Sequence, residues 1–204
     1  MPSQTDIVNL GLRMIGATTI TSLTDGSDSA NAAADIFDIL LDDILRQNFW
    51  NFATKRVKLA RSSTAPTFEF QYAYALPSDW IRTVSVHPDT DGASGMFYKE
   101  ELVNGQRVIA ADVEDVYMRY IARITDPNLW SSDFQRAVAA TLARDLSIPL
   151  ASSNSLYDRM DISRTKALAR ARSTDAMGSS PEVRPRGSWV NRRGVQRPIV
   201  GDTQ

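Results

Sequence analysis

Residues 29–60 read SANAAADIFDILLDDILRQNFWNFATKRVKLA, and this stretch decides the fold. From Ala33 to Leu45 the apolar side chains recur every three or four residues, which predicts a helix with one broad apolar face. The periodicity ends before residues 49–52, which hold three aromatic side chains, and a basic segment follows at residues 55–59. The stretch therefore predicts a long helix whose aromatic end is the junction with a different kind of structure.

Acidic residues run along the polar side of this predicted helix. Asp35, Asp38 and Asp42 are spaced i, i+3, i+7, which places them on one stripe away from the apolar face. Either Ser29 or Asp28 is expected to cap the start of the helix. The chemistry of the stretch is packing and surface charge, and it carries no catalytic pattern.

Other helices are predicted on both sides of the middle of the chain. A first helix is expected over residues 3–16, where Ser3 and Asp6 have the spacing of a capping box. Another begins at Ser132 and is expected to stop at Pro149, because proline cannot donate a backbone hydrogen bond. A last helix is predicted over about residues 155–176, with three basic side chains along one side: Arg159, Lys166 and Arg170.

The hydrophobic period changes from 3.6 to 2 after Thr67, which predicts strands. The alternating large side chains of the first strand are expected to form a core face: Phe68, Phe70, Tyr72, Tyr74 and Leu76. Asn104-Gly105 has the composition of a two-residue type I′ hairpin turn. One strand is predicted on each side of that turn. Two further strands are predicted over residues 81–86 and 116–124.

Together these patterns predict an α+β fold. A helical bundle of N- and C-terminal helices, residues 1–56 and 125–178, is expected to hold an inserted antiparallel β domain, residues 57–124. An extended C-terminal tail, residues 179–204, follows.

The C-terminal tail differs in composition from the rest of the chain. It holds three prolines, three glycines and five arginines with little periodicity, so it is expected to be flexible in isolation. A tryptophan flanked by arginines is typical of an interface hot spot, and the alternative is a disordered end with an incidental tryptophan. The predicted partner-binding residues are Arg184, Arg186, Trp189, Arg192, Arg193 and Arg197.

The net charge of −1 conceals an asymmetry, because residues 156–204 carry ten Arg or Lys against five Asp or Glu. A basic C-terminal quarter on an acidic body favours an anionic partner, either nucleic acid or an acidic protein surface.

Several function classes lack their signatures. The chain has no cysteine, no HExxH motif, no phosphate-binding glycine loop and no GxSxG motif. Ser163 and Lys166 match SxxK, the spacing at which a lysine can activate a serine nucleophile. The S-D-N and K-T-G motifs that accompany SxxK in such active sites are missing. No enzyme activity, cofactor or metal is therefore expected. No apolar run reaches the roughly 18 residues of a membrane-spanning helix, and the N-terminus lacks a signal-peptide pattern. His87, the single histidine, is expected at the surface.

Several segments, taken in order, resemble the podovirus head-to-tail adaptor family, often called tail tubular protein A. The first are LRMIGA at residues 12–17 and ITSL at residues 20–23. The alanine-rich helix start at 29–34 follows, and then LRQNFWNFATKR at 45–56 and YAYALPSDWIR at 72–82. The W-N-F-A-x-K-R and Y-x-L-P-x-D-x-x-R patterns are the most specific. Trp80 stands where the family commonly has a smaller residue.

The resemblance implies a structural virion protein of the phage tail, assembled in the host cytoplasm. Such adaptors form a homododecameric ring between the portal protein and the tail nozzle protein, double-stranded DNA passes through the ring without sequence-specific binding, and some relatives help seat tail fibres. In such a ring the C-terminal tail is expected to dock on the portal. The Asp35, Asp38, Asp42 stripe and the Arg159, Lys166, Arg170 stripe are candidates for a channel lining or a subunit interface, and a solvated helix face is the alternative reading of the acidic stripe.

Two other functions remain open. One is a helical connector or stopper of a long-tailed phage, which would need little β structure. The other is a DNA-binding accessory protein that uses the arginine-rich C-terminus, for which salt-sensitive binding to duplex DNA would be the sign.

Overall fold

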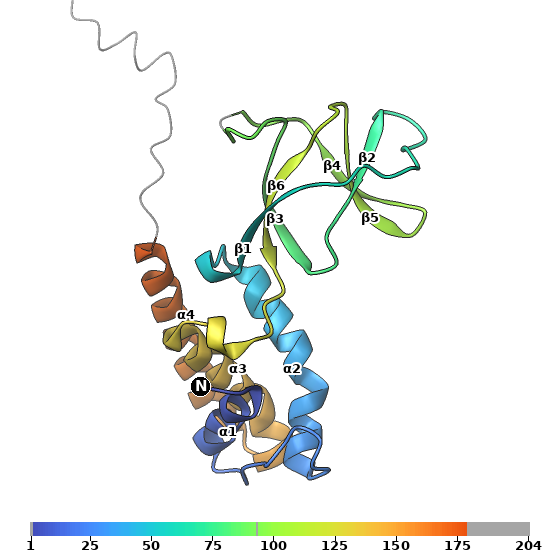
Figure 1. The fold of residues 1–204 in the computed structure, drawn as a ribbon. Coiled ribbons are helices and arrows are strands. Elements are labelled where there is room, and N and C mark those ends of the chain that lie inside the picture. Colours follow the sequence, from blue (N-terminus) through green and yellow to red (C-terminus); the bar gives the residue numbers. More distant parts are fainter. Residues whose placement is uncertain (1, 93, 179–204) are drawn as a thin grey trace, which may run out of the picture.

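The computed structural model describes residues 2–92 and 94–178, and the C-terminal tail with its six predicted partner-binding residues lies outside this part of the chain. The described residues form the predicted α+β structure, with the helices of both chain ends on one side and the strands on the other (Figure 1). The helices are α1 (Gln4–Ile15), α2 (Asp28–Gln47), α3 (Ser132–Ala151) and α4 (Asn154–Met177).

Helix α3 is the centre of the helical part, since it packs against α1, α2 and α4. Its buried side chains are mostly small, so its neighbours approach closely. Gly11 of α1 lies so near α3 that a Cβ atom on it would stand 2.9 Å from the carbonyl oxygen of Ala139. Because the side chains at this crossing are small, the two helix backbones pack directly against each other.

Two helix ends differ from the sequence-based expectation. Ser27, rather than Ser29 or Asp28, caps α2, and its side chain accepts a hydrogen bond from the Ala30 N–H. Pro149 does not stop α3, which continues to Ala151 and ends at Ser152 with φ 48°. Proline is tolerated there because it lies exposed in the last turn, where its missing N–H removes only one hydrogen bond.

The strands form two antiparallel sheets of three. One sheet has the order β1 (Thr54–Lys58), β6 (Tyr117–Ala122), β3 (Trp80–His87). The other has the order β2 (Tyr72–Ala75), β5 (Gln106–Ala111), β4 (Lys99–Val103). The predicted hairpin joins β4 to β5, and Asn104 and Gly105 have φ values of 49° and 78°, as a type I′ turn requires.

The strand predicted over residues 68–76 begins later than expected, and the predicted aromatic core face is wrong at Phe68. Glu69 has φ 75°, which breaks the extended chain, and β2 begins only at Tyr72. Phe68 is 79% exposed, whereas Phe70 is buried and stacks on Phe97 with ring centroids 5.7 Å apart. Alternation alone could not reveal a left-handed residue inside the run.

Short 3-10 helices join the two parts: η1 (Asn51–Ala53) leads into β1, and η2 (Pro127–Leu129) leads from the sheet into α3. The first strand starts at Thr54, slightly before the expected boundary at residue 57. None of the helices described here is long and apolar enough to cross a membrane.

Candidate interaction surfaces

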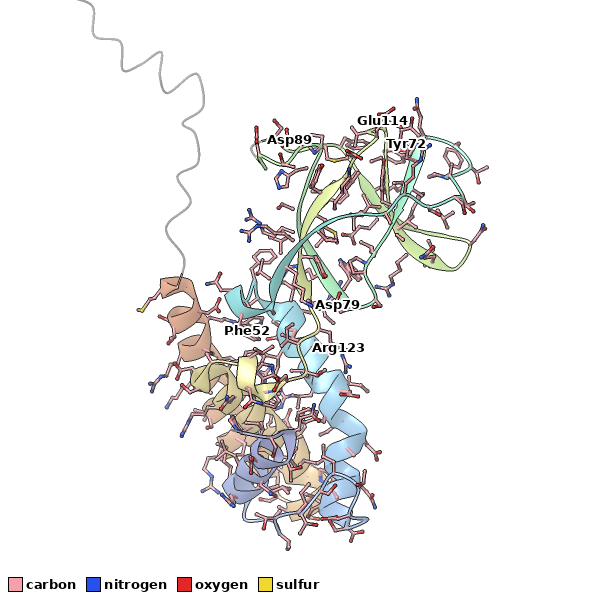
Figure 2. The ribbon with its side chains drawn as sticks, in the orientation of Figure 1. Phe52, Tyr72, Asp79, Asp89, Glu114 and Arg123 are labelled. Atoms are coloured by element: carbon pink, nitrogen blue, oxygen red, sulfur yellow. The ribbon has the colours of Figure 1, made fainter. Side chains whose placement is uncertain are left out.

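The aromatic end of α2 forms the junction between helices and strands. Trp50 is fully buried, and its Nε1–H donates to the Ile44 carbonyl oxygen at 2.9 Å. Its ring meets that of Phe134 on α3 edge-on, with centroids 4.9 Å apart. Phe52 is only half-buried, but its ring lies 4.7 Å from Phe134 (Figure 2). The cluster fixes the exit of α2 against the N-terminal end of α3.

Polar contacts connect the two segments that contain the most specific motifs. Lys55 Nζ lies 2.7 Å from the Asp79 carboxylate. Arg46 Nη1 donates to the Ile81 carbonyl oxygen at 3.0 Å, and Arg82 Nη1 donates to the Arg46 carbonyl oxygen at 3.2 Å. The segments at residues 45–56 and 72–82 therefore meet at the junction, where Figure 2 labels Asp79.

Asp79 is held charged by these contacts. Burial raises the pKa of its carboxyl group, but hydrogen bonds from Lys55 and Tyr120 outweigh burial, so the pKa lies below the usual 3.8. The Tyr120 hydroxyl donates to Asp79 Oδ1 at 3.0 Å. Burial and this hydrogen bond raise the pKa of Tyr120 to about 12.

Arg123 forms ion pairs with two of the three acids in the predicted acidic stripe of α2. This arginine follows β6, where the chain returns to the helices (Figure 2). Its Nε lies 2.6 Å from Asp42 Oδ1 and its Nη2 lies 3.0 Å from Asp38 Oδ1. The hydrogen bond with Asp42 raises the pKa of Arg123, although burial opposes the shift. Asp35 is exposed and has no ion-pair partner in the described part of the chain.

The predicted basic stripe of α4 is exposed at Arg159, Lys166 and Arg170. Arg170 Nε lies 2.9 Å from Asp133 Oδ1 at the start of α3. Within residues 2–92 and 94–178, no ion pair joins this stripe to the acids of α2. Whether either stripe faces a channel or a second subunit stays a prediction.

Sequence reasoning did not reveal a groove between α2 and α3, here called the α2–α3 groove. Its volume is about 510 Å³. Ile39 on its α2 side is 74% exposed. The groove is lined by Ala32, Asp35, Ile36, Ile39, Leu40, Asp43, Thr141, Arg144, Asp145, Leu146 and Pro149. The spacing of Asp35, Ile39 and Asp43, four residues each, was the available signal.

A second surface feature lies on the β1–β6–β3 sheet. Arg56 on β1 and Arg119 on β6 are direct cross-strand partners. They line a hollow of about 350 Å³ beside His87 and the loop that carries Asp89. Neither arginine has an acidic partner among the described residues, and like charges opposite each other are unfavourable. His87 is half-buried rather than fully at the surface, since its ring contacts Ser94 and Ser85.

Among the residues placed in the structure, no cluster of three or more His, Asp or Glu side chains could hold a metal ion. Comparison of the chain with models of known protein families found no match, and comparison with curated proteins found no similar relative. Two surfaces therefore remain as candidate sites, the α2–α3 groove and the paired arginines of the sheet.

Proposed function

We propose that this chain is a structural phage protein that forms a ring adaptor between the portal and the tail nozzle, with a central channel through which DNA passes. The observation that carries the proposal is the meeting of the two most specific motif segments. Both contribute to one junction through the Lys55–Asp79 ion pair and the Arg46 and Arg82 backbone contacts. The two most specific parts of the resemblance therefore lie in one structural unit, although they are separated in the sequence.

The arrangement of elements supports the same proposal. Helices from both ends of the chain pack together, and the strands are inserted between them. The resemblance to the adaptor family implies the same order, with N- and C-terminal helices combined in one domain and a β-rich domain inserted between them. The six strands of the described part count against a helical connector or stopper, which would need little β structure.

A ring requires two different faces on each subunit, because its contacts are heterologous. The acidic side of α2 and the basic side of α4 lie on separate elements and provide such faces. Charge complementarity of this kind speeds association and selects the partner surface. In the ring, repeated weak contacts of the C-terminal tail with the portal gain strength from multivalency.

The test is to mix the full chain with the cognate portal and to measure the mass and appearance of the product. A ring of this chain on the portal is the expected result. Deletion of residues 179–204 is expected to leave a folded protein that binds the portal poorly, since the predicted contact residues are removed. Normal portal binding by the shortened chain would contradict the docking role of the tail.

A DNA-binding accessory protein is the second candidate, and the opposed Arg56 and Arg119 favour it. Two guanidinium groups without an ion-pair partner among the described residues suit a phosphate group, although Asp89 and Asp91 line the same hollow. Binding of the free chain to duplex DNA that weakens steeply with salt would support this function in place of the adaptor.

A further inference from the structure

We infer that the α2–α3 groove binds the C-terminal tail, residues 179–204, of its own chain, with Trp189 against Ile39. The inference concerns the free protein, and it does not depend on the proposed adaptor function. It rests on the chemistry of the groove, on the composition of the tail, and on the place where α4 ends.

The groove has an apolar floor. Ile36 and Ile39 come from α2, and the buried Leu40 and Leu146 lie between the two helices. An exposed isoleucine next to such a floor leaves apolar surface that a large side chain can cover. A tryptophan is well suited, because its flat ring buries much area with few rotatable bonds.

The rim of the groove is acidic. Asp35 and Asp43 stand one turn on either side of Ile39, and neither forms an ion pair within the described residues. Asp145 on the opposite wall is already paired with Arg144 at 2.6 Å. The groove thus presents free negative charge on its α2 side only. An occupant with positive charge beside an apolar group would match both features.

The C-terminal tail has this composition. It carries five arginines against Glu182 and Asp202, and its apolar residues include Trp189 and Ile199. Arg186 and Arg192 lie three residues before and after Trp189. With the ring over Ile39, arginines on both sides can approach Asp35 and Asp43. Arginine also forms bidentate hydrogen bonds with carboxylates, which a lysine cannot match.

The tail leaves the structure near one end of the groove. Arg172 of α4 donates from Nη2 to Gln47 Oε1 at 3.0 Å, and Gln47 donates to Asp43 at 2.8 Å. Helices α2 and α4 both run toward the strands, so their C-terminal ends lie together (Figure 1). Asp175 confirms this by accepting the backbone N–H of Asn51 at 3.0 Å.

The chain is long enough to turn back. From Gly178 to the level of Arg172 is about 9 Å of helix, and from Gln47 to Ile39 is about 12 Å. The eleven residues from Gly178 to Trp189 can span about 36 Å when extended. The tail therefore reaches Ile39 of its own chain with length to spare. Binding within one chain also has a high effective concentration, which offsets the cost of ordering the tail.

Occupation of the groove would withhold the tail from other partners. A protein that captures the tail must first displace it from the groove, so the α2–α3 groove would set the affinity of the tail for that protein. A displaceable segment of this kind delays binding until a stronger partner is present.

The chain contains no cysteine, which permits a clean disulfide test in the full-length protein. Ile39→Cys combined with Val190→Cys keeps Trp189 and places two thiols at the inferred contact. The matched control is Leu102→Cys with Val190→Cys, since Leu102 is 68% exposed on β4, away from the helices. Mild oxidation is expected to produce an intramolecular disulfide at least about five times faster in the first variant, because docking raises the effective thiol concentration.

Charge reversal provides the second measurement. Asp35→Lys with Asp43→Lys, added to the 39/190 variant, is expected to slow disulfide formation several-fold, since like charges would repel the tail. The control Glu114→Lys with Asp158→Lys reverses two exposed acids outside the groove and should leave the rate unchanged.

Each outcome is decisive. Equal rates in the 39/190 and 102/190 variants would overturn the inference, and so would insensitivity to charge reversal in the groove. Disulfide-linked dimers in place of the intramolecular product would assign the groove to a second copy. Portal binding is measured separately, so failure of the docking inference leaves the adaptor proposal standing, and the converse also holds.

Discussion

At the scale of single residues, Asp79 and Trp50 hold the junction between helices and strands. Asp79 accepts hydrogen bonds from Lys55 and Tyr120 with its carboxylate, and its backbone oxygen accepts the Arg123 N–H at 2.7 Å. Trp50 combines full burial with a satisfied indole N–H. Asp79 thus provides polar contacts at the junction, and Trp50 provides apolar contacts there.

Trp50→Ala is expected to lower the free energy of unfolding by about 3–5 kcal/mol, because a buried indole leaves a cavity that its neighbours fill only partly. Urea unfolding followed by circular dichroism measures the loss. The control Phe68→Ala, at a 79% exposed side chain, should change stability by less than about 0.5 kcal/mol. Similar effects for both variants would contradict the central place given to Trp50.

Asp79→Asn is expected to make stability depend less on pH. The pKa of Asp79 is lowered in the folded protein, so the unfolded chain takes up the proton first as the pH falls. The stabilisation is present above pH 4 to 5 and is lost as the pH drops through the lowered pKa. Because the ion pair is partly exposed, the variant should be about 1 kcal/mol less stable at pH 7.

The measurement for Asp79→Asn is the difference in unfolding free energy from the unchanged protein between pH 7 and pH 3. That difference should shrink toward pH 3, since the unfolded chain takes up the proton at position 79 before the folded protein does. A difference that stays constant over this range would refute the charged state assigned to Asp79.

At the scale of elements, the helices are joined by close backbone approach rather than by large side chains. Helix α3 buries four alanines, Ala137, Ala139, Ala140 and Ala143, and Ala171 of α4 is buried as well. Helix α1 crosses α3 at Gly11, where no side chain would fit. Close approach of this kind makes the helix positions sensitive to single methyl groups.

Gly11→Ala is expected to destabilise the protein although alanine is the better helix former. A Cβ atom would stand 2.9 Å from the Ala139 carbonyl oxygen and 3.3 Å from Leu142 Cδ2. Overpacking costs about 1–3 kcal/mol, whereas the gain in helix propensity is only about 1 kcal/mol. Thermal unfolding should show a lower midpoint. Gly95→Ala, where nothing lies within 4 Å, is the control and should be neutral or slightly stabilising.

At the scale of the whole molecule, few contacts position the strands relative to the helices. Arg123 joins the end of β6 to Asp38 and Asp42 of α2, and Arg46 and Arg82 bond each other's segments across the same boundary. These contacts come from residues that are far apart in the sequence. They set the relative placement of the two parts, on which any larger assembly would depend.

A double-mutant cycle on Arg123→Ala and Asp42→Ala is expected to show a coupling energy of about 0.5–1 kcal/mol, because the pair is partly exposed and screened by solvent. Urea unfolding of the four proteins provides the values. The same cycle on Lys58 and Asp115, whose side chains are 53% and 52% exposed, should show a smaller coupling. Equal coupling in both cycles would indicate that Arg123 contributes no more than an ordinary surface pair.

The helices and the hairpin turn could be predicted because their signals are local. The capping box of Ser3 and Asp6 forms within one turn, and Asn104-Gly105 sets its own backbone angles. The ends of elements were harder to predict. Glu69 interrupts a run of alternating residues, and Pro149 lies inside a helix that it was expected to end. The local sequence pattern does not include the tertiary contacts that determine such ends.

The sequence by itself determined the α+β class, the order of helices and strands, and the junction at the aromatic end of α2, because hydrophobic period and capping act over a few residues. Only the tertiary structure decided that Arg123 pairs with Asp38 and Asp42, that Arg56 lies opposite Arg119, and that Ile39 stands exposed between Asp35 and Asp43 in a groove. These arrangements depend on how distant segments pack, and on the strand register. A one-dimensional pattern shows which side of an element is apolar, but not which residue from another part of the chain will meet it.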